Sequence, residues 1–83
     1  QSFNVFPNPA ESETNIAFEL SGNSEVKLSV LDITGREIIV LESATLSAGL
    51  HQYQLTSSQV KAKGSYFIRL EVNGTQMVKT VVF

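Results

Sequence analysis

Apolar and polar residues alternate along most of the chain, as they do in strands with one buried face and one solvated face. The alternation is clear in Ile16, Phe18 and Leu20 and again in Val26, Leu28 and Val30. It predicts seven strands, over residues 3–6, 14–20, 25–31, 36–42, 50–55, 65–72 and 75–83. No segment of helical length repeats its apolar residues every 3.6 positions, so we expect an all-β domain.

Turn residues separate these strands, and Asn73-Gly74 is the strongest hairpin signal because both residues accept positive φ. Short strands at this regular spacing predict a seven-stranded antiparallel immunoglobulin-like β-sandwich. A small barrel is the alternative, because spacing does not give the strand order. Residues 56–63 are polar and are expected to form a connection. The run Ile38-Ile39-Val40 is apolar at consecutive positions, so we expect both faces of its strand to be covered.

Two registers are open for the final hairpin. A two-residue turn places Ile68 opposite Lys79, and a three-residue bulged turn places it opposite Val78. In either register the last strand carries apolar side chains on both faces. One face belongs in the core, and the other lies under a neighbouring segment or docks a partner by strand addition or in a groove. The same edge is a candidate dimer contact.

The composition argues against several classes of function. Eighty-three residues form one domain, 1–83, with 42% hydrophobic and 17% charged residues, as in ordinary globular proteins. A net charge of -2 with scattered basic residues argues against binding to nucleic acid. No apolar run reaches the ~20 residues of a membrane-spanning helix. The absence of cysteine excludes disulfides and thiol chemistry.

The chain has few residues that could serve in catalysis. His51 is the only histidine and alternates with Tyr53, so we expect a half-buried sheet residue and no catalytic base. The acidic residues are dispersed, which predicts no metal site, and the glycines stand singly, which predicts no phosphate loop or bound cofactor. The pattern therefore indicates a small β-sandwich that is not an enzyme.

Three short motifs and the terminal strand, in this order, carry a resemblance. They are Phe6-Pro7-Asn8-Pro9, Asp32-Ile33-Thr34-Gly35-Arg36, Gly64-Ser65-Tyr66 and Lys79-Thr80-Val81-Val82-Phe83. From residue 5 to residue 83 the chain resembles the type A C-terminal sorting domain of proteins exported by the type IX secretion system. The run before Gly64 carries one more residue than the family pattern, which affects the local loop path only.

The resemblance implies that 1–83 is a fragment of a longer cargo protein and works as its folded secretion signal. The implied partners are the type IX translocon, an outer-membrane shuttle barrel protein and a cell-surface sortase, which commonly cleaves the domain and attaches the cargo. The implied destination is the cell surface or the medium of a Gram-negative bacterium, reached through the periplasm.

The resemblance also divides the motif residues into two groups. Recognition is assigned to the terminal strand, at Lys79, Thr80, Val81, Val82 and Phe83. A structural role is assigned to Pro7, Asn8, Pro9, Asp32, Gly35, Arg36, Gly64, Tyr66, Asn73 and Gly74. Two alternatives stay open: a fibronectin-like adhesion or carbohydrate-binding accessory module of a surface enzyme, and a spacer that stabilises a neighbouring domain.

Overall fold

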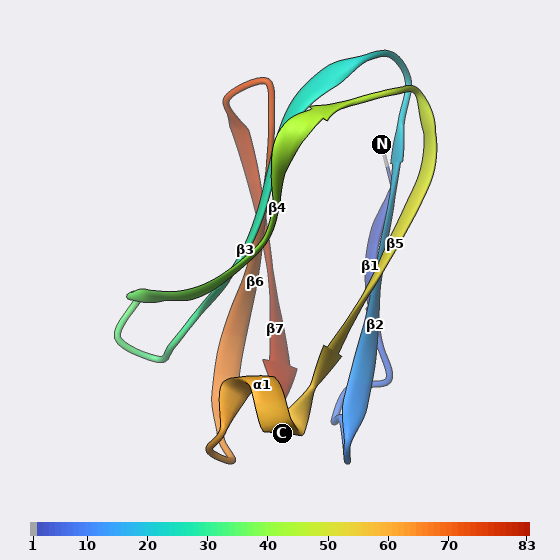
Figure 1. Ribbon diagram of the computed structural model, residues 1–83. Coiled ribbons are helices and arrows are strands. Elements are labelled where there is room, and N and C mark those ends of the chain that lie inside the picture. Colours follow the sequence, from blue (N-terminus) through green and yellow to red (C-terminus); the bar gives the residue numbers. More distant parts are fainter. Residues whose placement is uncertain (1) are drawn as a thin grey trace.

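Two antiparallel sheets pack face to face in the computed structural model, which describes residues 2–83 (Figure 1). The strands are β1 (Phe3–Phe6), β2 (Glu13–Leu20), β3 (Ser24–Leu31), β4 (Glu37–Leu46), β5 (Gly49–Thr56), β6 (Ser65–Val72) and β7 (Thr75–Val82). One sheet has the order β1-β2-β5 and the other the order β4-β3-β6-β7. The predicted all-β antiparallel sandwich is confirmed.

The core lies between the sheets and is built by the alternating residues. Ile16, Phe18, Leu28 and Ile68 are fully buried or nearly so. Phe18 also stacks on two rings of the neighbouring strand β5, with centroid distances of 5.5 Å to His51 and 5.8 Å to Tyr53. Cross-strand aromatic pairs of this kind stabilise a sheet beyond the burial of their area.

Strand β4 differs from the expectation. It runs on to Leu46, because residues 43–46, which include the polar Ser43 and Thr45, pair with β3. The side chains of Ile38 and Val40 are 38% and 47% exposed, so the prediction that both faces of this strand are covered is wrong. The physical reason is its place: β4 is one of the two edge strands of its sheet, and these two side chains face solvent.

A single helical turn, α1 (Ser57–Val60), interrupts the expected connection between β5 and β6. Its first turn is capped by Gln59, whose Oε1 accepts the Thr56 backbone N–H at 2.8 Å. It ends at Lys61, which has a left-handed backbone with φ 71°. Val60 is buried and anchors the turn on the core.

The open register of the last hairpin is resolved. Ile68 lies opposite Lys79, as the two-residue turn requires. Asn73 and Gly74 have φ of 50° and 86°, the backbone that a tight hairpin turn of this kind needs at both positions.

Candidate functional site

Strand β7 presents its residues very unequally. Val81 is fully buried in the core, whereas Val78 and Val82 are 54% and 38% exposed on the outer face of the sheet. Thr80 is exposed on that outer face as well. The five residues assigned to recognition therefore do not form one continuous surface, because Val81 belongs to the core.

Lys79 is exposed at the opening between the two sheets. Its Nζ lies 5.9 Å from the centre of the Phe3 ring on β1, within the range of a cation–π contact. Phe3, Lys79 and the neighbouring residues Met77 and Val78 line a shallow groove there.

The backbone edge of β7 is only partly free. Phe83 and Gly64 exchange both backbone hydrogen bonds, so the bonded pairs of the hairpin fall at every second residue. The N–H and C=O groups of Gln76, Val78, Thr80 and Val82 consequently point away from β6. Within residues 2–83, no hydrogen bond reaches the outward groups of Gln76 and Val78.

Further along this edge, the Pro7-Asn8-Pro9 motif supplies the missing partners. Asn8 Nδ2 donates to the carbonyl oxygen of Thr80 at 3.0 Å, and Asn8 Oδ1 accepts the N–H of Val82 at 3.1 Å. The N–H of Ala10 donates to the carbonyl oxygen of Val82 at 2.8 Å. The first motif is thus bound to the terminal strand.

The third motif holds the other side of the same strand end. Gly64 bonds to Phe83 in both directions, at 2.8 and 3.1 Å. The Tyr66 ring is buried and meets the Phe83 ring edge-on, with centroids 6.1 Å apart. The Tyr66 hydroxyl donates to the carbonyl oxygen of Ala62 at 2.6 Å, which satisfies its polar end.

The second motif forms a self-contained turn between β3 and β4. Asp32 Oδ1 accepts the N–H groups of Thr34 and Arg36, each at 3.0 Å. The Thr34 hydroxyl also donates to it, and this bond is the main reason why the pKa of Asp32 is lowered from its usual value. The Arg36 side chain is 81% exposed, 3.5 Å from the Asp32 carboxylate. In the described part of the chain no hydrogen bond or ion pair joins this turn to β7.

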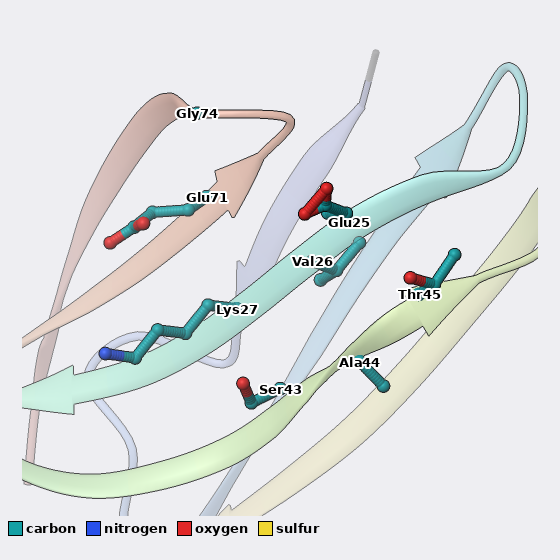
Figure 2. Close-up of a pocket in the computed structure, with 8 residues that line it drawn as sticks. All are labelled: Glu25, Val26, Lys27, Ser43, Ala44, Thr45, Glu71 and Gly74. Atoms are coloured by element: carbon teal, nitrogen blue, oxygen red, sulfur yellow. The ribbon is translucent and has the colours of Figure 1, made fainter.

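A hollow of about 360 Å³ lies on the outer face of the four-stranded sheet, between the ends of β3, β4 and β6 (Figure 2). Lys27 and Glu71 are two of the residues that line it, on neighbouring strands.

The outer face of this sheet also carries a cluster of ion pairs. Lys27 Nζ lies 3.0 Å from Glu37 Oε2, and Arg69 Nη2 lies 3.1 Å from the same oxygen. The Lys27 ammonium is the largest cause of the lowered pKa of Glu37. The charges thus neutralise one another across the strands.

The side chains with catalytic potential have structural partners. His51 Nε2 lies 2.8 Å from the carbonyl oxygen of Ser47, while its ring stacks on Phe18, as expected for a half-buried sheet residue. The Tyr53 hydroxyl donates to Glu42 Oε1 at 2.8 Å, and burial, with this carboxylate, raises the pKa of Tyr53 to about 12. Among residues 2–83 there is no group of three His, Cys, Asp or Glu side chains able to hold a metal ion.

In residues 2–83 no helix is both long and apolar enough to cross a bilayer.

The structure therefore brings the first and third motifs to the terminal strand and leaves the second motif, residues 32–36, apart from it. The sequence analysis assigned Pro7, Asn8 and Pro9 a structural role but did not predict the contact of Asn8 with β7. The sequence did contain one signal for this contact. Of Pro7, Asn8 and Pro9, only Asn8 has a side-chain amide, which can both donate and accept hydrogen bonds.

Residues 4–83 match the model of a family described as the secretion system C-terminal sorting domain. A search of curated proteins finds no match to the chain.

Proposed function

Since the chain belongs to the family of secretion system C-terminal sorting domains, we propose that its terminal strand, with residues 79–83, directs a cargo protein to the type IX translocon. The domain is a sorting signal of type IX secretion, and the family is not a catalytic one. On this proposal the domain carries out no reaction itself. An outer-membrane shuttle barrel protein collects the cargo after export, and a sortase at the cell surface cleaves the domain and attaches the cargo.

The match over residues 4–83 is the observation that carries this proposal. The geometry supports a role of the terminal strand in recognition, because Lys79, Thr80 and Val82 present their side chains to solvent on a strand that is held at both edges. A rigid strand loses less conformational entropy on binding to a partner than a flexible tail does. The proposal gives Asp32, Gly35, Arg36, Asn73 and Gly74 a structural role at their turns.

The test is export of a reporter. Residues 1–83 are fused behind a fluorescent protein that carries a periplasmic leader, in a strain with a working type IX system and in a strain without one. We expect fluorescence at the cell surface or in the medium of the competent strain only. Retention in the periplasm of both strains, with the domain folded, would contradict the sorting role and leave an adhesion or carbohydrate-binding module as the better interpretation.

A variant separates recognition from folding. Lys79→Ser, Thr80→Ala and Val82→Ser together change three exposed side chains and keep the buried Val81 and the C-terminal Phe83. This variant should melt close to the wild-type temperature and lose export. Leu50→Ser, at a side chain 61% exposed on β5, is the control and should be exported normally. Undiminished export of the triple variant would rule out the terminal strand as the recognised element.

A further inference from the structure

The contacts between residues 8–10 and β7 follow the pattern of a parallel β-ladder. In such a ladder one residue donates to the carbonyl of residue i and accepts from the N–H of residue i+2. The Asn8 side chain does this with Thr80 and Val82, at 3.0 and 3.1 Å. Ala10, two residues later, then donates to Val82 at 2.8 Å, where the next rung belongs. The Asn8 side-chain amide therefore stands where a peptide group of a neighbouring strand would stand.

The local sequence fixes the position of Asn8. Pro7 and Pro9 have restricted φ angles. In such a ladder their positions would face away from β7, so their missing N–H groups remove no rung. The segment is anchored on both sides of Asn8. The buried Thr14 hydroxyl donates to the carbonyl oxygen of Pro7 at 3.0 Å, and Ala10 is only 4% exposed in the core. The amide is therefore aimed at β7 by a fixed stretch of chain.

This arrangement divides the outer edge of β7 into two parts. The backbone of Thr80 and Val82 is occupied by Asn8 and Ala10, whereas the outward groups of Gln76 and Val78 stay open. A partner strand cannot pair with backbone groups that are already bonded. The side chains of Thr80 and Val82, however, stay accessible on the outer face of the sheet.

We propose that Asn8 is a positioning residue of the sorting signal, and that the secretion machinery reads Thr80 and Val82 through their side chains and not by strand addition. This rests on the function proposed above. Asn8 binds the outward backbone groups of Thr80 and Val82 and thereby fixes the direction of their side chains. Only the part of β7 nearer the turn, at Gln76 and Val78, keeps outward backbone groups that could pair with another strand.

Amide hydrogen exchange on the 83-residue chain, followed residue by residue by NMR, tests the contact itself. The Val82 N–H is expected to be protected although it faces the edge. In Asn8→Ala its exchange should accelerate about tenfold, the scale of one lost hydrogen bond. The Val81 N–H, which faces β6, should keep its rate. Equal Val82 rates in both proteins, or the same acceleration at every amide, would overturn the proposal.

Export of the fluorescent fusion tests the consequence. Asn8→Ala should lower export by about threefold or more, because the two side chains lose their fixed direction. Asn4→Ala, at an exposed asparagine on β1, is the matched control and should be exported like the wild type. Recognition by strand addition would give the opposite result, since Asn8→Ala opens the edge and should then raise export.

The two proposals can fail separately. A wild-type fusion that is not exported would overturn the sorting function, whatever the exchange rates are. Normal export of Asn8→Ala, with Val82 deprotected, would leave the sorting function standing and overturn the positioning role of Asn8.

Discussion

Gly64 and Phe83 exchange two backbone hydrogen bonds, with N···O distances of 2.8 and 3.1 Å. They continue the pairing of β6 and β7 by one residue beyond the regular strand, so the last residue of the chain is held in the sheet. Gly64 makes this contact with φ 143°, a backbone conformation that residues with a Cβ rarely adopt. The position of Phe83 therefore depends on a glycine at the other end of the hairpin.

Gly64→Ala should destabilise the domain by about 1–3 kcal/mol through backbone strain alone, because a Cβ there would meet no atom within 4 Å. Gly22→Ala is the matched control: its Cβ also meets nothing within 4 Å, and its φ lies outside the glycine region. Urea unfolding of both variants is the measurement. Equal midpoints would show that the backbone of Gly64 is not strained by a side chain.

Val81→Ala and Val82→Ala should differ in their effect on stability, because one residue faces the core and the other faces solvent. Val81 is fully buried, so its truncation should cost about 1.5–3 kcal/mol in the free energy of unfolding. Val82 is 38% exposed and should change stability by less than about 0.5 kcal/mol. Urea unfolding gives both values. If Val82→Ala proves as costly as Val81→Ala, the assignment of faces on β7 is wrong.

Alkaline pH should weaken the fold through Tyr53. The pKa of its phenol is raised from 10.0 to about 12, so the folded state holds the proton more tightly than the unfolded state. The corresponding stabilisation is complete below pH 10 and is lost as the pH rises toward 12. Urea midpoints between pH 9 and pH 12 should fall in the wild type and fall less in Tyr53→Phe; parallel curves would contradict this.

Acid should also weaken the fold, through Asp32 at the turn between β3 and β4. The pKa of Asp32 is held below its usual 3.8, mainly by the Thr34 hydroxyl. Its stabilisation is present above pH 3.8 and is lost as the pH falls through the lowered pKa. Thr34→Val should raise the pKa of Asp32 toward 3.8, measured by NMR of its carboxyl carbon. An unchanged pKa would show that the hydroxyl bond does not form in solution.

Strand positions were predictable where one face is buried, as at Ile16 and Leu28, because burial imposes the alternation of residue types. The polar end of β4 was not, since Ser43 and Thr45 belong to a strand only through their pairing with β3. The turn α1 is too short to show a helical period, although Thr56 and Gln59 have the spacing of a capping box.

The candidate site was predictable in its residues and not in its contacts. The motifs gave Asn8 and the terminal strand separately, because no local pattern links residues 74 positions apart. The same holds for Gly64, whose turn character is visible in the sequence while its partner Phe83 is not. Contacts of this kind follow from the tertiary fold alone.

The contact between Asn8 and Val82 also has a kinetic meaning. It closes a loop of nearly the whole chain, and the entropy cost of closing a loop grows with its length. We therefore expect it to form after the transition state, so that Asn8→Ala accelerates unfolding and leaves the folding rate almost unchanged in stopped-flow experiments. If this contact forms last, its hydrogen bond is present in the completed domain and absent from partly folded chains.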